Sequence, residues 1–154
     1  MIMSRSADYA LRAMIYLTRK RGPRFIPLNE ISQEMGTPPF LLARLMQSLV
    51  RAGLVQSMKG HHGGFRLLGD PGEIRAAAIV HAIMGPFKTF DCTETFGCGL
   101  NHSCNLVDLF VRAEEALQAV FQSVTLEQLA KMPSAVNGHS IHRVDLVLDR
   151  TTLQ

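Results

Sequence analysis

Tryptophan is absent from the chain, and no apolar run approaches the ~18 residues that a membrane-spanning helix needs. Residues 1–8 also lack the basic stretch followed by an apolar core that marks a secretory signal. Charged residues make up only 19% of the 154 residues, whereas hydrophobic residues make up 47%. This composition excludes a wholly disordered chain and predicts one compact domain, or one small domain with an extension. We therefore expect a globular cytoplasmic protein with no membrane partner.

Cysteine is scarce and unevenly distributed. The three cysteines, Cys92, Cys98 and Cys104, follow the spacing C-x5-C-x5-C in one short window. An odd number in a chain without a secretory signal argues against a disulfide framework. The spacing also differs from the C-x2-C knuckle of structural zinc and from the redox C-x-x-C motif. Equal spacing in one window suggests that the three thiols share one chemistry.

Three chemistries fit these thiols. Three thiolates in a glycine-containing loop can converge on an iron–sulfur cluster, either [2Fe-2S] or [4Fe-4S], which usually takes four protein ligands. The fourth ligand must then come from a distant carboxylate or from one of the local candidates His102, Asp91, Asn105 and Asp108. The alternatives are a reversible thiol switch without metal and a zinc site.

Charge is divided between the two halves of the chain. Residues 1–75 hold 11 Lys/Arg and 5 Asp/Glu, a net charge of +6, whereas residues 76–154 hold 5 and 8, a net charge of −3. A basic half joined to an acidic half suggests a polyanionic partner for the basic half. Chance clustering of solvated charges is the plainer interpretation of this pattern.

The basic half predicts a helix-turn-helix. Apolar residues recur at steps of three and four over 6–20, and shorter helices follow over 28–35 and from Pro38 to Gly53. Gly36 closes the second helix, and Thr37 is expected to cap the third. The polar face of that third helix consists of Arg44, Gln47, Ser48 and Arg51. Two helices joined by a tight turn, the second with a basic face, are typical of DNA-binding proteins.

A β-hairpin follows these helices. Residues 54–58 and 65–68 can pair as strands around the glycine-rich tip 59–64, which makes the predicted fold a winged helix-turn-helix, mainly α with a small β-hairpin. The third helix can then read the major groove while the hairpin follows the backbone or the minor groove. The candidate DNA-binding residues are Thr37, Pro39, Phe40, Ala43, Arg44, Lys59, His61 and His62.

The second half predicts two more helices around the cysteines. Residues 73–84 form a largely apolar helix, in which His81 is expected to be a core or interface histidine. Residues 105–122 form a long helix whose apolar stripe packs either on its own domain or, as we favour, on the same helix of a second subunit. The predicted divisions are a winged-helix domain (1–84), a cysteine loop (85–104), a dimerisation helix with a closing helix at 125–131 (105–131) and a C-terminal tail (132–154).

Several stretches together are specific for one family. They are Asp8–Met14 (DYALRAM), Arg51–Val55 (RAGLV), the run K-G-x-x-G-G-F-R-L from Lys59, the three cysteines and Thr125–Leu129 (TLEQL). Over about residues 1–132 the chain resembles the bacterial iron–sulfur winged-helix regulators that include IscR, NsrR and RirA. The resemblance implies a homodimeric repressor on palindromic double-stranded DNA. It also implies that an iron–sulfur cluster controls DNA affinity and senses nitric oxide, iron or cluster supply, or redox state.

The resemblance also bears on the ligands. The IscR type carries a histidine three residues after the last cysteine, where this chain has Val107. The NsrR type uses an aspartate of the first helix, supplied across the dimer, and Asp8 stands at the matching place. The chain is therefore most similar in ligand pattern to the NsrR type, which implies Asp8 as fourth ligand beside the three cysteines. The start of the third helix, residues 38–43, departs from the polar residues usual in the family.

A metal-free thiol switch remains the alternative function, and an enzyme is not expected. No pair of nucleophile and base stands out in the sequence, and no cofactor fingerprint is present.

Overall fold

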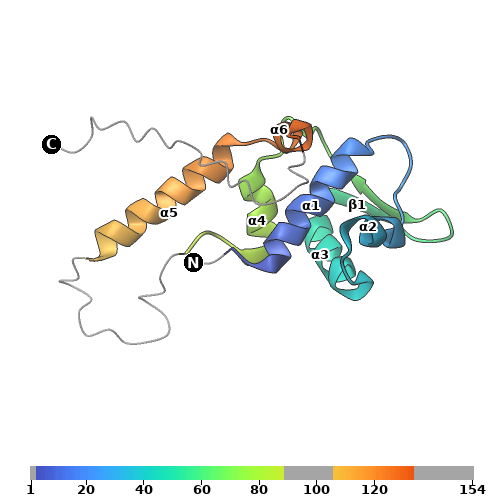
Figure 1. The fold of residues 1–154 in the computed structure, drawn as a ribbon, viewed down its shortest axis with the longest axis horizontal. Helices are drawn as coiled ribbons and strands as arrows, with labels where there is room; N and C mark the ends of the chain where they lie inside the picture. The colour runs from blue at the N-terminus through green and yellow to red at the C-terminus, as the bar shows by residue number, and fades with distance from the viewer. Residues whose placement is uncertain (1–2, 89–105, 134–154) are drawn as a thin grey trace.

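The computed structural model describes residues 3–88 and 106–133, and the mainly α architecture with a small hairpin is confirmed over these ranges. The elements, shown in Figure 1, are α1 (Arg5–Arg19), α2 (Leu28–Met35), α3 (Pro39–Arg51), β1 (Val55–Met58), β2 (Gly64–Leu67), α4 (Ala76–Met84), α5 (Leu106–Ser123) and α6 (Leu126–Lys131). None of the helices in the described ranges is long and apolar enough to cross a membrane.

Helix α1 lies at the centre of the core. Its start is capped by Ser4, whose side chain accepts a hydrogen bond from the Ala7 amide. Its buried residues, spaced by three and four, are Ala7, Ala10, Ala13, Met14 and Leu17. This apolar stripe packs against α2, α3, α4 and α6, so one helix fixes the positions of four others.

A polar contact ties α1 to α2 at the surface. The hydroxyl of Tyr16 donates to Oε1 of Glu30 over 3.1 Å, and Arg24 donates to both oxygens of the same carboxylate. Desolvation raises the pKa of Tyr16, and the neighbouring Glu30 carboxylate raises it further. The phenol therefore stays neutral and acts as the donor in this link.

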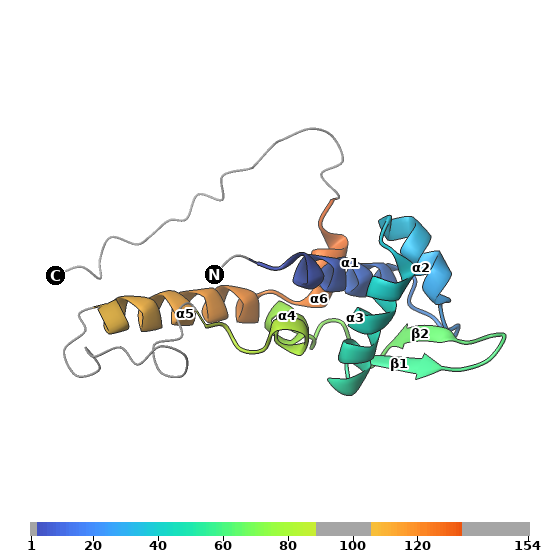
Figure 2. The ribbon, with the colours of Figure 1, turned by 90° about the horizontal axis from the view of Figure 1, so that it is seen from below.

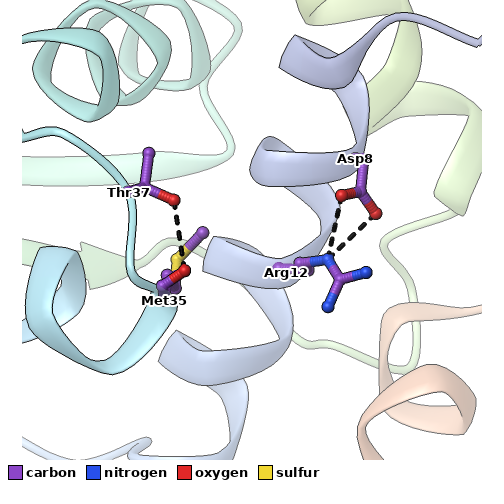
Figure 3. Close-up of polar contacts among 4 residues, drawn as sticks. All are labelled: Asp8, Arg12, Met35 and Thr37. Carbon is purple, nitrogen blue, oxygen red and sulfur yellow. Dashed lines mark hydrogen bonds and ion pairs between the residues drawn. The ribbon is translucent and has the colours of Figure 1, made fainter. Parts of the chain in front are cut away.

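The turn between α2 and α3 departs from one expectation. Gly36 adopts a left-handed conformation with φ 58° and ends α2 as predicted. The prediction that Thr37 caps α3 is wrong, because Pro38 is the N-cap and the helix begins at Pro39. The Thr37 hydroxyl instead points back to α2 and donates to the carbonyl of Met35 over 3.4 Å (Figure 3). Ser32 Oγ donates to the Thr37 carbonyl over 2.6 Å, which further fixes this residue in the turn.

The hairpin forms the wing. Strands β1 and β2 pair antiparallel with Val55 opposite Leu67 and Met58 opposite Gly64. On its other edge, Phe65 exchanges two backbone hydrogen bonds of 2.8 Å with Ile26. The wing is therefore anchored to the loop before α2, and Figure 2 shows it lying beside α3 with its tip projecting from the body.

Helix α4 packs against α1, α3 and α5. It begins at Ala76, three residues later than predicted, and it is less completely buried than its apolar sequence indicates, since Ala78 is exposed. His81 lies edge-on to Phe87, with ring centroids 5.1 Å apart, and its buried Nε2 has no hydrogen-bond partner in the described part of the chain. His81 is partly buried, which fits the expected position in the core or at an interface.

Helices α5 and α6 differ in how they attach. Over most of its length α5 extends away from the body (Figures 1 and 2), and among its described residues none is buried. Helix α6 returns to the core, where Leu126 is fully buried against α1. A capping box joins Thr125 and Gln128 through reciprocal hydrogen bonds of 3.2 and 2.8 Å. The closing helix therefore packs with the winged-helix core.

Candidate functional site

Helix α3 presents two different faces. Its buried residues, which attach it to the core, are Leu42, Leu45, Met46 and Leu49. Its exposed residues, at positions that share the opposite face, are Phe40, Arg44, Gln47 and Arg51. The Arg51 guanidinium donates to Ser48 Oγ over 2.9 Å, which holds it along the helix surface. The second helix of the helix-turn-helix thus offers a basic face to solvent, as a DNA-reading helix must.

The predicted DNA-binding residues near the start of α3 differ in accessibility. Phe40 is 80% exposed and Pro39 is also exposed, whereas Ala43 is half-buried. Thr37 is only 3% exposed, and its hydroxyl is already used in the turn. This burial argues against direct contact between the Thr37 side chain and DNA. The accessible members of the predicted set therefore begin at Pro39.

The predicted residues of the wing are all exposed. Lys59, His61 and His62 lie in the turn between β1 and β2, where the two imidazole rings meet edge-on with centroids 5.0 Å apart. Gly60 has φ 102°, a conformation that glycine adopts most easily, and its carbonyl accepts from the Gly63 amide over 2.9 Å. The wing tip therefore carries one permanent positive charge and two imidazoles on a tight glycine turn.

A groove lies between the wing and helices α2 and α3. Its volume is about 480 Å³, and it is bordered by Asn29 of α2, Gln47 of α3 and Lys59 and His61 of the wing. The sequence did not single out Asn29, because its place beside the groove depends on how α2 meets the hairpin. Amide, imidazole and ammonium groups are hydrogen-bond donors that suit phosphate oxygens. The groove therefore presents hydrogen-bond donors of the kind that contact phosphate oxygens.

Arg66 holds the root of the wing. Its guanidinium lies 4.6 Å from the centroid of the Phe25 ring and donates to Gln56 on the paired strand over 2.8 Å. It also donates to the carbonyl of Pro23 over 3.2 Å. These contacts join both strands to the loop before α2, so the wing is positioned relative to the helix-turn-helix.

The proposed ligand Asp8 lies in the first turn of α1. Its carboxylate accepts from Nε of Arg12 on the next turn, with 3.0 Å to each oxygen (Figure 3). The Asp8 side chain is 49% exposed, so the carboxylate is accessible from solvent. Arg12 did not emerge from sequence reasoning, although the i,i+4 spacing of opposite charges on a helix is a recognisable signal.

Cys92, Cys98 and Cys104 lie outside the described residues, as do the local candidates Asp91, His102 and Asn105. Asp108 is exposed in the first turn of α5 and pairs with Arg112 over 3.7 Å. Within residues 3–88 and 106–133, no group of three metal-binding side chains comes together. The described part of the chain therefore supplies two accessible carboxylates among the predicted candidates, Asp8 in α1 and Asp108 in α5.

Known proteins share this architecture. CymR of Bacillus subtilis (strain 168) is 32% identical over 130 residues, which cover 84% of this chain and 90% of that protein. Its solved structure, described as that of the global cysteine regulator, superposes with a TM-score of 0.68 at 31% identity, covering 84% of this chain and 96% of the other. The oxidized form of Staphylococcus aureus CymR gives a TM-score of 0.70 at 28% identity, covering 86% and 98%.

An IscR structure from T. potens has the same fold at 21% identity, with a TM-score of 0.66 and coverage of 91% of this chain and 94% of the other. The family model for Rrf2, described as an iron-dependent transcriptional regulator, matches residues 3–132. These matches span the helix-turn-helix, the wing and both later helices, and the proteins they identify are regulators rather than enzymes. The chain therefore belongs to the Rrf2 family of transcriptional regulators.

Proposed function

We propose that the chain forms a homodimer that represses transcription from a palindromic operator, and that an iron–sulfur cluster controls its affinity for DNA. The observation that carries this proposal is the C-x5-C-x5-C set in the connection between α4 and α5. This connection follows α4 of the winged-helix core and precedes the exposed helix α5. A change at the cysteines can thus affect both the DNA-binding winged-helix domains and the contact between subunits.

The donor set fits an iron–sulfur cluster. Cys92, Cys98 and Cys104 supply three thiolates, and the accessible carboxylate of Asp8 supplies a fourth, harder ligand. When bound, such a cluster supplies a soft, redox-active iron centre that nitric oxide, oxidants or iron shortage can destroy. Arg12 neutralises the Asp8 carboxylate while no metal is bound, and the exposed pair separates at little cost.

The start of α1 lies beside the point where the chain enters the cysteine-bearing connection. Phe87, the last buried residue before it, forms a small apolar cluster with Ala77 and Val80 of α4, and Leu11 of α1 packs against this cluster. Asp8 precedes Leu11 by three residues and therefore lies on a neighbouring part of the same helix surface. The family resemblance implies that Asp8 ligates the cluster held by the cysteines of the partner subunit. Ligation would then be coupled to the relative position of the two winged-helix domains.

The surface of α5 supports the homodimer. Its exposed large apolar residues are Leu106, Val107, Leu109, Val111, Leu117 and Val120. Leu106, Leu109, Leu117 and Val120 share one side of the helix, and such an apolar side favours a partner because large contiguous apolar patches are rare on monomeric proteins. A second copy of the same helix supplies a matching surface through two-fold symmetry, and a two-fold dimer suits a palindromic operator.

A metal-free thiol switch is the second candidate function. It is favoured by the similarity to CymR, described in one species as a global cysteine regulator and solved in another in an oxidized form. In that case two of the three thiols form a disulfide, and their two electrons and two protons pass to an oxidant such as a peroxide or another disulfide.

An anaerobic absorption spectrum separates the two candidates. A cluster gives a brown protein with visible absorption bands that each single Cys→Ala variant loses. A thiol switch gives a colourless protein in which mass spectrometry detects a disulfide after oxidation and free thiols after reduction. The second result, with native DNA binding retained, would replace the cluster proposal.

A further inference from the structure

Phe40 is unusually exposed for a phenylalanine. At 80% exposure it is the most accessible large hydrophobic residue in the described ranges. Phenylalanine is normally buried, and leaving its ring in water is unfavourable. Four of the exposed apolar residues of α5, Leu106, Leu109, Leu117 and Val120, share one side of that helix, but Phe40 stands apart from them at the start of α3. Its exposure therefore calls for a separate explanation.

The position of Phe40 is fixed by the chain around it. Pro38 is the N-cap and Pro39 the first helical residue, and the amides of Leu41 and Leu42 both donate to the Pro38 carbonyl over 3.1 Å. Proline restricts φ, so the backbone of the first turn is rigid and fixes the direction in which the Phe40 side chain leaves the helix. Phe40 is consequently held in the first turn, which is the part of a recognition helix that contacts base edges.

The neighbours of Phe40 are polar. Arg44 follows it by four residues and Gln47 by seven, so the three share one face of α3. Both neighbours are exposed, and both can hydrogen-bond to base edges: arginine to guanine and glutamine to adenine. Phe40 is thus the apolar member of a face that otherwise carries hydrogen-bond donors.

The major groove offers one apolar feature to such a residue. Among the four bases, only thymine presents a methyl group at its major-groove edge, and a phenylalanine side chain can pack against it. We infer that Phe40 is a specificity-determining residue that reads a thymine methyl in each half-site of the operator. This inference rests on the proposed binding of α3 in the major groove and adds the base that its first turn selects.

The test begins with duplexes selected by the wild-type protein from a randomised double-stranded pool. Each thymine of the selected half-site is then replaced in turn by deoxyuridine, which lacks the methyl group and keeps every hydrogen bond. We expect one position at which this replacement weakens wild-type binding roughly fourfold, the value that corresponds to burial of one methyl-sized group. At the same position 5-methylcytosine should bind better than cytosine, because it restores the methyl alone.

The variants make the assignment specific. Phe40→Ala should be insensitive to deoxyuridine at that position while keeping the effects of other base changes, and Phe40→Leu should retain part of the sensitivity. Met132→Ala removes another exposed apolar side chain, outside α3, and should behave as the wild type. Unfolding curves of all variants should match, since Phe40 makes little contact with the core.

Two failures are distinguishable. If the wild-type protein selects no sequence at all, the proposed DNA-binding function fails. If it selects a sequence but Phe40→Ala responds to every deoxyuridine as the wild type does, only the thymine contact is overturned. Insertion of Phe40 between base pairs also overturns the thymine contact. It would appear as a DNA bend that Phe40→Ala loses, with no effect of the thymine methyl.

Discussion

Nε of Arg12 lies 3.0 Å from each carboxylate oxygen of Asp8, one turn away on α1. Both side chains are about half or more exposed, so water and salt screen the pair. Such pairs contribute ~0–1 kcal/mol to stability. The contact therefore places Asp8 without committing it to a structural role, and it leaves the carboxylate available to another partner.

The first prediction concerns this pair. Asp8→Ala should lower the free energy of unfolding by less than ~1 kcal/mol in urea titrations, because only a screened ion pair is lost. The same variant should retain iron but respond abnormally to the signal, since one ligand of four is replaced. Arg12→Ala removes the ion pair and keeps the carboxylate, so it should respond normally. Equal behaviour of the two variants in cluster-loss assays would contradict Asp8 ligation.

The second prediction separates reading from docking. Lys59→Ala on the wing should weaken binding about equally across DNA sequences and reduce the salt slope by roughly one unit, because a contact to phosphate is lost. Arg44→Ala on the exposed face of α3 should instead relax sequence preference. Binding to selected and random duplexes over a range of salt concentrations measures both effects. Unchanged binding of both variants would remove the winged-helix docking geometry.

The third prediction concerns Gly64. Its φ is 151°, and a Cβ built there would overlap the backbone of Ile26 and Pro27. Gly64→Ala should destabilise the fold by at least ~3 kcal/mol, because backbone strain and overlap add. Gly53→Ala is the matched control, since φ there is 71° but no atom lies within 4 Å of the added Cβ. It should cost only about 1–2 kcal/mol. Thermal unfolding compares the two variants. Equal losses of stability would show that overlap with the Ile26 backbone adds nothing to the cost of a side chain at position 64.

The fourth prediction concerns the dimer. Leu109 on α5 is 59% exposed, so Leu109→Glu should leave the subunit folded while placing a charge in the proposed interface. Sedimentation should then detect monomers where the wild type forms dimers, with unchanged circular dichroism. Leu68→Glu, at another exposed apolar position, should remain dimeric. A dimeric Leu109→Glu variant would place the interface elsewhere.

The ranges of several helices were predictable from local signals. The apolar spacing of α1, the closing Gly36 of α2 and the range 125–131 predicted for α6 agree with the structure to within a residue or two. Thr37 was misassigned because capping propensity does not include the competing local hydrogen bond, in which its hydroxyl donates to the Met35 carbonyl two residues earlier. The pairing of Phe65 with Ile26 was also missed, because it joins segments far apart in the sequence.

The candidate site was predictable to a similar degree. The basic face of α3 and the exposed wing follow from helical periodicity and glycine content, and the described structure has both. The groove between Asn29 and Lys59 depends on how three elements pack, which no local pattern encodes. Binding of a cluster by the three cysteines stays a prediction, because these residues lie outside the described ranges.

Iron and acid-labile sulfide are counted per dimer after anaerobic purification. Comparing these counts with the operator affinity of the same sample shows whether a cluster controls DNA binding. We predict that the wild-type protein contains both elements and that removing them changes its affinity for the selected duplex. Single replacement of Cys92, Cys98 or Cys104 by alanine should abolish both elements and leave a folded dimer. A wild-type protein that contains neither element yet binds the duplex in a redox-dependent manner would contradict control by an iron–sulfur cluster.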